Sequence, residues 1–543
     1  MEHAVRVGEQ NTLSAIDTTS HTRDRPLPAD SGNLALLACF AAAMVLACLI
    51  YEPWRTAPFS IVDFSEFLPL LTRNDSFGAR LIAFVNYYST QGRFNVVVYV
   101  YLVSEWSLFG WNAAAWHLSR FAEMCGIAAL SYVLLLRMTG SRIGAAAGAS
   151  LYFVASCAAP AWIRLSTAEV IGMWPLLGGA LLATRYQCSQ HWRASATAIA
   201  VLAAFAVLSK EVLIVFVPLV VLLAWTYCGP DHFVQPRASR RNLWLACTTA
   251  AAITVPIILI LIIAARAHGP AYALAYGHAP VSMARSVGIL LGLVLPTFST
   301  YAPFTSFALP ANMVFLIILA AGWTVSPVDT GLRRSHRSIA ACLMAISVIG
   351  TLVYSPWPLF NFFYGLPYLI VPAALLAFAI KTINRHWPRR LWVALSACAL
   401  ILAQAAAFAA YDARHAFALR EVNGALVKSV ATRPATNSLI VTTKAISELS
   451  WIDTGPTLGR FVAALYPSRT LLSARSVSCE TMRAGNDVHV PRGSVLITYA
   501  DDCGTFPHPA WSERRVFSYF YWPALSLRQD SIRVDMLAAP ASY

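Results

Sequence analysis

The chain alternates between long apolar runs and short polar stretches. Each apolar run is close to the ~20 residues that an α-helix needs to cross a hydrocarbon core of ~30 Å. We therefore predict an all-α polytopic membrane protein with about eleven transmembrane helices. The apolar runs cover 34–51, 113–136, 143–161, 168–186, 194–209, 211–228, 243–265, 307–325, 338–354, 364–380 and 391–410.

Two apolar stretches need separate treatment. The run 194–228 is almost continuous, and as one helix it would measure ~52 Å, which is too long for a single crossing. Its two flanks are basic, so we predict two crossings with a turn at Ser-Lys-Glu, residues 209–211. The stretch 286–302 is interrupted by Pro296, and we interpret it as a re-entrant or interfacial segment.

The distribution of charge sets the expected orientation. The formal net charge is +14, but the basic residues gather in short loops between apolar runs, which is the positive-inside pattern and excludes a nucleic-acid partner. We expect a bacterial inner membrane protein in contact with the lipid bilayer, with a cytoplasmic tail at 1–33 and a retained first anchor. The basic residues include Arg137, Arg142, Arg185, Arg193, Arg237, Arg240, Arg241, Arg333, Arg334, Arg337, Lys381, Arg385, Arg389 and Arg390.

Three regions follow from this pattern. A transmembrane domain covers 34–410 and carries a long first outer loop at 52–112. An odd number of crossings leaves 411–543 outside. There a helical pattern at 412–431 is followed by strand-like NSLIVTT, helical TLGRFVAALY and strand-like SVLITYA and RVFSYFYW, so we predict a small periplasmic, extracytoplasmic α/β domain. The chain has 11 cysteines, and two of them, Cys479 and Cys503, lie in this tail, where they either pair or remain thiols.

The first outer loop carries an acidic motif, SIVDFSEFLPLL, at 60–71. Ser60 and Asp63 have the spacing of a capping box, so Asp63 could simply cap a helix. A helix over this stretch would also place Asp63 and Glu66 on one face, where they could serve as a general base and a partner that tunes it. Glu52 and Asp75 are reserve candidates.

Further ionisable residues lie at the predicted outer ends of the helices. Arg164 and Glu169 could be a snorkelling cation and an acid that complements a helix dipole, or they could face the same compartment as Asp63. Lys210 and Glu211 interrupt an apolar run, and ionisable groups at membrane depth usually mark function. The alternative is a polar turn at the interface.

The loop 264–286 adds Arg266, His268, His278 and Arg285. Two histidines ten residues apart without an acidic third ligand are a weak metal signal, so no cofactor is certain and a divalent metal stays an open alternative. Phosphate recognition by Arg266 or Arg285 is favoured. In the aromatic stretch 356–369, Tyr364 belongs either to an interfacial belt or to the lining of a substrate cavity.

The layout resembles the GT-C glycosyltransferases, the multi-span enzymes that use polyprenyl-phosphate sugars, such as protein O-mannosyltransferases and aminoarabinose transferases. The resemblance covers about 34–410. It depends on acids in a first outer loop, GRFN at 92–95, SKEVLIVFVPLVVLL at 209–223 and a terminal extracytoplasmic domain. In this chain Asp63 lies about a dozen residues after the first span, farther than in several relatives.

The resemblance implies transfer of a sugar from a polyprenyl-phosphate carrier to an extracytoplasmic glycan, lipid or protein. The configuration at the anomeric carbon would be inverted if displacement is direct. Asp63 would take the acceptor proton, and Glu66 or Glu169 would orient the acceptor or a water. The leaving phosphate would be held by Arg164, Lys210 and Arg285. A transporter or flippase for a lipid-linked glycan is the main alternative, and a non-catalytic envelope assembly protein is the other.

Overall fold

The computed structural model describes most of the helical region and parts of the tail. The described ranges are 41–53, 67–72, 74–165, 167–229, 232–233, 239–266, 282–297, 302–324, 330–356, 362–431, 438–443, 462–465, 473–478, 495–499, 509–521 and 526–537.

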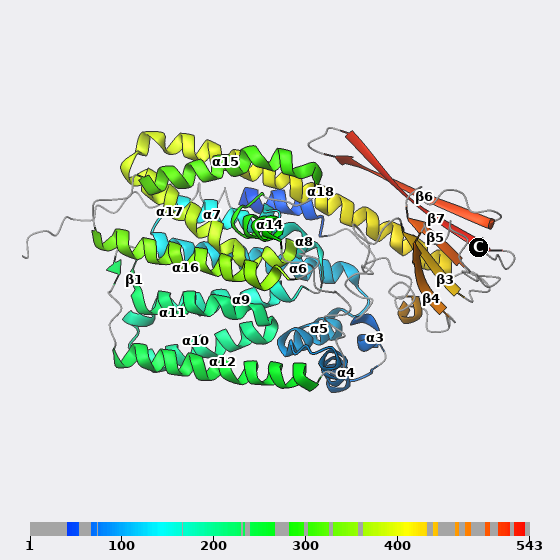
Figure 1. Ribbon diagram of the computed structural model, residues 1–543, viewed down its shortest axis with the longest axis horizontal. Helices are drawn as coiled ribbons and strands as arrows, with labels where there is room; N and C mark the ends of the chain where they lie inside the picture. Colours follow the sequence, from blue (N-terminus) through cyan, green and yellow to red (C-terminus); the bar gives the residue numbers. More distant parts are fainter. Residues whose placement is uncertain are drawn as a thin grey trace, which may run out of the picture.

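Helices form the main body of the molecule (Figure 1). After a helix at Ala41–Tyr51 come α3 Phe67–Thr72, α4 Phe77–Thr90, α5 Val96–Phe109, α6 Ala113–Thr139, α7 Arg142–Val154, α8 Ala158–Ile163, α9 Ala168–Ala183 and α10 Trp192–Ser209. They are followed by α11 Val217–Thr226, α12 Arg240–Arg266, α14 Met283–Val294, α15 Ala302–Thr324, α16 Thr330–Tyr354, α17 Ile370–His386 and α18 Leu391–Ala431. Short 3₁₀ turns include η1 Tyr186–Cys188, η2 Glu211–Phe216, η3 Phe362–Gly365, η4 Pro367–Leu369 and η5 Pro388–Arg390.

The helices agree with the predicted membrane-protein character. Among the described residues, five helices are long and apolar enough to cross a membrane, and seven shorter apolar helices have 10–17 residues. The figure of eleven crossings stays a prediction.

The predicted break in the run 194–228 is confirmed. Helix α10 ends at Ser209, Lys210 is extended with φ −155° and ψ 120°, and the chain continues through η2 into α11. The amide of Gln187, next to the start of α10, donates to the Ala224 carbonyl near the end of α11 at 2.7 Å. The chain therefore returns antiparallel to α10, and Lys210 lies at the turn.

The stretch around Pro296 is too short for a crossing. Helix α14 has 12 residues, about 18 Å at 1.5 Å per residue. The Pro296 carbonyl accepts a hydrogen bond from the Ser156 backbone at 3.0 Å, which ties the end of α14 to the loop before α8. This agrees with a re-entrant or interfacial segment.

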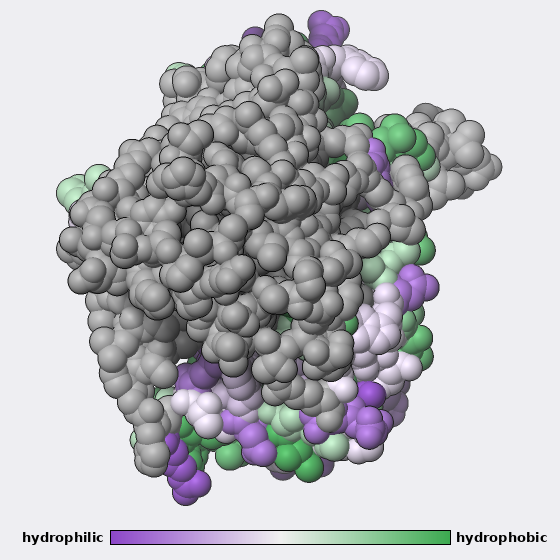
Figure 2. Space-filling model, turned by 90° about the vertical axis from the view of Figure 1, so that its right-hand side faces the viewer, coloured by the Kyte–Doolittle hydropathy of each residue, from purple (hydrophilic) through white to green (hydrophobic). Residues whose placement is uncertain are grey.

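The two ends of the helical body differ in character. At one end Arg193 and Arg241 pack on tryptophans, and Arg137 donates to Thr184 at 3.4 Å. At the other end lie α3, α4 and α5, on the same side as the sheet of the tail (Figure 1). Seen from that end, the described surface mixes hydrophilic and hydrophobic side chains (Figure 2). The basic loops are thus separated from the first loop, as predicted, while the side of the membrane on which each lies stays a prediction.

Small residues allow close packing in the middle of the body. A Cβ added at Gly144 or Gly148 would lie 2.6 Å or 2.5 Å from the backbone oxygens of Ala377 and Ala373, respectively. Helices α7 and α17 therefore approach each other closely at these two small residues, which lie four positions apart.

The tail begins inside a helix. Helix α18 has 41 residues and is about 62 Å long, so the last apolar run and the helix predicted after it are one continuous element. It extends from the helical body toward the sheet (Figure 1). Because ~30 Å suffices to cross a hydrocarbon core, its second half lies beyond any crossing.

Five strands follow, with order β4-β3-β5-β7-β6. Strand β3 Ser438–Thr443 pairs in parallel with β4 Ser473–Ser478 and with β5 Val495–Tyr499, whereas β7 Ser526–Leu537 is antiparallel to β5 and to β6 Pro509–Tyr521. The strands predicted at NSLIVTT and SVLITYA are confirmed, and β6 includes the predicted RVFSYFY; β4 and β7 were not predicted. The extracytoplasmic placement of this α/β unit stays a prediction, and Cys479 and Cys503 lie outside the described residues.

Candidate functional site

A largely buried cation lies at the turn between α10 and η2. The side chain of Lys210 is 12% exposed, and its Nζ lies 3.4 Å from Oε1 of Glu169, which is 2% exposed. The same Nζ lies 5.3 Å from the ring centroid of Tyr364. Three segments far apart in the sequence, the first turn of α9, the 209–211 turn and η3, therefore meet at one ammonium group. All three residues were predicted site residues.

The environment keeps Lys210 charged. The Glu169 carboxylate at 3.4 Å and the face of the Tyr364 ring at 5.3 Å both favour the charged form of this ammonium. Within the described residues, Oε1 of Glu169 accepts no hydrogen bond, so its contact with Lys210 is an ion pair at a longer distance. An ion pair of this length leaves the ammonium with donors to offer to another anion.

Aromatic rings form one wall beside Lys210. Tyr364 stacks on Tyr354 with ring centroids 5.3 Å apart, and Tyr354 meets Tyr368 edge-on at 6.3 Å. Tyr368 also packs on Phe216 of η2 at 4.9 Å. These contacts fix η2, and with it the turn at Lys210, against η3 and η4. The ring of Tyr364 thus lies beside Lys210, and whether it lines a substrate cavity or belongs to an interfacial belt stays a prediction.

The first loop reaches the same turn through Arg93. Burial raises the pKa of the Tyr99 hydroxyl, and the charges of Arg93, Glu211 and Lys210 modify it, so these three groups lie within electrostatic reach of one ring. The backbone N–H of Asn95 donates to the Tyr99 hydroxyl at 3.1 Å, which anchors the segment before α5. The GRFN segment, used above only for the resemblance, therefore brings a second cation toward Lys210.

Arg285 approaches this group from α14. The hydroxyls of Ser286 and Ser355 lie 2.9 Å apart, and Ser355 directly follows Tyr354 in the aromatic wall. Arg285 is half-buried, and its Nε has no hydrogen-bond partner within the described residues. The helix that carries Arg285 thus contacts the segment that follows Tyr354, and a role for Arg285 beside Lys210 stays a prediction.

A second polar cluster, which was not predicted, joins α5 to α6. The Tyr101 hydroxyl lies between Glu105 and Glu123, 2.7 Å from Oε1 of Glu105, and Ser119 donates to the same oxygen at 2.7 Å. Burial raises the pKa of Glu105; Arg120 opposes the rise and Glu123 adds to it. Its Oε2 is buried without a partner within the described residues. A carboxyl group in this environment is held toward its protonated form.

Arg120 connects this cluster to the loop before Glu169. The guanidinium is 1% exposed, pairs with Glu123 and donates to the Leu165 carbonyl. Two residues further on, Thr167 donates to the Ala161 carbonyl at 2.9 Å. The short connection from α8 to α9 is therefore fixed at both ends, and this connection sets the position of Glu169 relative to Lys210.

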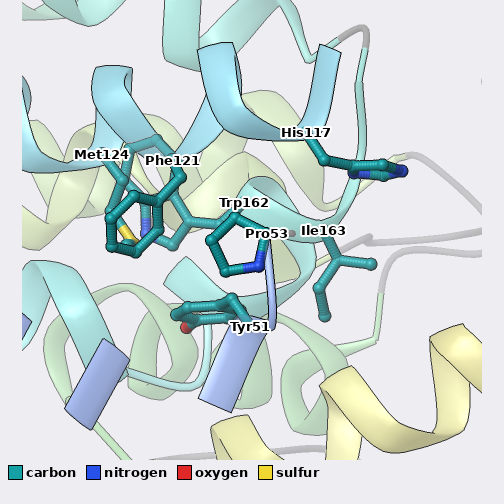
Figure 3. Close-up of a pocket in the computed structure, with 7 residues that line it drawn as sticks. All are labelled: Tyr51, Pro53, His117, Phe121, Met124, Trp162 and Ile163. Carbon is teal, nitrogen blue, oxygen red and sulfur yellow. The ribbon is translucent and has the colours of Figure 1, made fainter. Parts of the chain in front are cut away.

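A cavity of about 20 Å³ lies beside α8, the helix that precedes this connection (Figure 3). It is large enough for about one water molecule. The lining is mostly aromatic and apolar and comes from the end of the first described helix, α6 and α8. The residues that line it are Tyr51, Pro53, His117, Phe121, Met124, Trp162 and Ile163. The cavity therefore lies at the end of the first described helix, next to Pro53.

Backbone strain occurs at the end of the first described helix. Glu52 has φ 40°, and it is the positive-φ residue other than glycine within the described ranges. A bulky residue in this region costs of order 1–3 kcal/mol, and such strain often accompanies functional sites. Glu52 therefore remains a reserve candidate for the general base.

The other predicted site residues are dispersed. Asp63, Glu66 and His278 lie outside the described residues. Arg164 is half-buried at the end of α8, beside the Leu165 carbonyl that Arg120 holds. Arg266 is exposed at the end of α12, a helix that contacts α4. Across the described part of the chain, no group of three or more His, Cys, Asp and Glu side chains could hold a metal ion.

The sequence contained a signal for the missed cluster. Arg120 and Glu123 interrupt an apolar run in the same way as Lys210 and Glu211 do, and Glu105 lies in another apolar stretch. Treating every ionisable residue within a spanning run as a candidate would have found Arg120 and Glu123, and extending this rule to shorter apolar stretches would have found Glu105.

Substitution of Gly172 tests the packing at Lys210. A Cβ at this position would lie 2.2 Å from Leu213 Cδ1 and 3.2 Å from Ser209 Cβ, so Gly172→Ala pushes the turn away from α9. We expect a loss of about 1–3 kcal/mol in the free energy of unfolding, the usual effect of overpacking, measured by thermal unfolding in detergent. Gly178→Ala on the same helix is the matched control, because its Cβ would meet only Leu202 Cδ1 at 3.7 Å. An equal effect at both glycines would contradict the packing account.

Removing the Arg120 guanidinium tests the clamp on the α8–α9 connection. Arg120→Met leaves Glu123 buried without its cation, and breaking such a pair costs about 3–5 kcal/mol. Arg385→Gln, an exposed arginine in the last turn of α17, serves as control with an expected change within about 0.5 kcal/mol. Chemical unfolding monitored by tryptophan fluorescence gives both values; a small change for Arg120→Met would show that the clamp is not a structural element.

Comparisons with known proteins give structural likeness only. No protein-family model and no curated protein matches the chain. The structure is similar to ArnT from Cupriavidus metallidurans bound to undecaprenyl phosphate, with 12% identity over 94% of this chain and 100% of that chain and a TM-score of 0.45. It is also similar to the archaeal oligosaccharyltransferase AglB from Archaeoglobus fulgidus in complex with an inhibitory peptide and a dolichol-phosphate, with 13% identity over 92% of this chain and 74% of that chain and a TM-score of 0.46.

Both likenesses are at 12% and 13% identity, so the family expected from the sequence stays a prediction. With TM-scores below 0.5, these likenesses carry no argument about activity. The function is therefore argued from the residues of this chain.

Proposed function

We propose that this chain is an integral membrane glycosyltransferase that moves a sugar from a polyprenyl-phosphate carrier to an extracytoplasmic acceptor, which is a cell-envelope glycan, a lipid or a protein. The observation that carries the proposal is the largely buried Lys210 with its long ion pair to Glu169 and its aromatic cover. A fixed ammonium group beside aromatic rings could bind the phosphate of a polyprenyl phosphate, while the hydrophobic chain of the carrier stays in the bilayer.

The cations would act on the leaving group. When the bond between the anomeric carbon and the phosphate oxygen breaks, negative charge grows on the phosphate, and fixed cations that stabilise this charge lower the barrier. Lys210 is the first candidate, with Arg93 and Arg285 near the same wall and Arg164 at the α8–α9 connection. Glu169 would keep Lys210 oriented in the absence of carrier.

The acceptor would enter from the first loop. Asp63 would accept the proton of the acceptor hydroxyl as its oxygen attacks the anomeric carbon, with inversion in a direct displacement. Glu66 or Glu169 would orient the acceptor. The products are a glycoside, polyprenyl phosphate and a proton on Asp63 that is released to solvent. The cavity lined by Pro53 and Trp162 lies next to the last residue described before the acidic motif (Figure 3).

The test of this function is turnover by the purified chain in a bilayer. A polyprenyl-phosphate sugar with a radiolabelled sugar is supplied, and formation of free polyprenyl phosphate is followed with and without an envelope extract as the source of acceptor. The proposal expects acceptor-dependent release of polyprenyl phosphate. Movement of intact carrier across the bilayer without bond cleavage would instead indicate the transporter or flippase.

A further inference from the structure

Two arginines and two tryptophans form a cluster at the basic end of the bundle, opposite α3–α5. The guanidinium of Arg193 lies 5.2 Å from the ring centroid of Trp192 and 5.8 Å from that of Trp244. Arg241 lies 5.8 Å from the Trp192 ring, and the two rings meet edge-on at 6.5 Å. The cluster joins the first turns of α10 and α12, two helices that pack side by side (Figure 1).

Neither arginine has a negative partner within the described residues. Arg241 donates to the Gln187 carbonyl at 3.2 Å, and the other contacts of both arginines are with rings. The ion pairs of Arg120 with Glu123 and of Lys210 with Glu169 lie elsewhere in the bundle. Two fixed cations close together without an anion repel each other. Both also lie in the first turn of a helix, where the positive end of the helix dipole disfavours a cation.

The surface beside the cluster is apolar and open. Trp244 is 45% exposed, Leu243 is 66% exposed, and only 11% of the apolar window of α12 is buried. Exposed side chains continue along the same helix at Val255, Ile258 and Leu261. Indole rings favour the headgroup level of a bilayer, and an acyl chain can lie along the apolar face.

We propose that Arg193, Arg241, Trp192 and Trp244 form a binding site for an anionic phospholipid. Guanidinium groups bind phosphate oxygens with well-defined geometry, and stacking on the indole rings holds these two in place. The headgroup phosphate would neutralise both arginines, and the acyl chains would cover α12. This site is separate from the proposed site of glycosyl transfer at Lys210, which lies at the other end of α10.

Native mass spectrometry of the full chain tests this site. The detergent-purified protein is titrated with phosphatidylglycerol, with phosphatidylcholine as the zwitterionic comparison and with inorganic phosphate as a competitor. We expect retention of phosphatidylglycerol over phosphatidylcholine and little displacement by inorganic phosphate at equal concentration. Equal retention of the two lipids, or full displacement by phosphate, would overturn the proposal.

Variants locate the site. Arg193→Gln with Arg241→Gln is expected to weaken phosphatidylglycerol binding about 30-fold, which is about 2 kcal/mol at 1.4 kcal/mol per tenfold. Arg385→Gln with Arg389→Gln removes the same charge from exposed positions near the end of α17 and should change binding about twofold at most. Arg193→Lys with Arg241→Lys keeps the charge and gives intermediate binding, so the test stands even if the glutamine pair folds poorly. Equal binding by wild type and the glutamine pair would refute the site.

Discussion

Lys210→Met is expected to lower the rate of sugar transfer about 10²- to 10³-fold, the usual effect of removing one group that stabilises a developing negative charge. The reason is the position of Lys210, whose Nζ is the cation shared by Glu169 and the Tyr364 ring in a largely buried place. Single-turnover rates with a polyprenyl-phosphate sugar give the effect on the chemical step apart from product release.

Two further variants separate charge from folding. Lys210→Met leaves Glu169 buried without a cation, which by itself destabilises the fold. The double variant Lys210→Met with Glu169→Leu removes that penalty and should remain as slow as the single variant. Lys381→Met in α17 is the matched lysine control and should transfer at the wild-type rate. If the Lys210 variants also transfer at that rate, the cation has no part in the reaction.

Asp63→Asn is expected to lower transfer about 10²- to 10⁴-fold, the range for loss of a general base. The amide keeps the size of the side chain but cannot take the proton of the acceptor hydroxyl. The same variant should bind polyprenyl phosphate as the wild type does, because the carrier phosphate is assigned to Lys210. Steady-state transfer and carrier binding are measured on one preparation.

Other acids serve as comparisons for Asp63. Glu66→Gln should have a smaller effect, since Glu66 is assigned to orientation, and Asp63→Glu should retain part of the activity. Glu52→Gln tests the reserve candidate for the base, which has a strained backbone directly after the first described helix. A large loss in Glu52→Gln together with normal transfer in Asp63→Asn would move the base to Glu52.

The sequence predicts the parts of the site better than their arrangement. The turn at 209–211 was predictable because ionisable residues interrupt an apolar run that is too long for one crossing. The meeting of Glu169, Lys210 and Tyr364 was not, because each belongs to a different segment and only tertiary packing brings them together. Arg93 was missed for the same reason: its partners lie more than a hundred residues further along the chain.

Two errors have other physical causes. Helix α5 was treated as part of a loop because an apolar run of 14 residues is shorter than a crossing, and Glu105 was overlooked with it. Strand β7 was missed because its charged residues hide the alternation of Ile532, Val534 and Met536. Successive side chains of a strand point to opposite faces, so apolar residues at every second position indicate a strand even when the residues between them are charged.

Binding of polyprenyl phosphate and of the matching polyprenol to wild type and Lys210→Met tests the central claim most directly. The two lipids share the same chain and differ in the phosphate that Lys210 is assigned to hold. We predict that wild type prefers the phosphate at least about tenfold, equivalent to 1.4 kcal/mol, and that Lys210→Met loses most of this preference. Equal affinity of wild type for the two lipids, or an unchanged preference in the variant, would contradict the account.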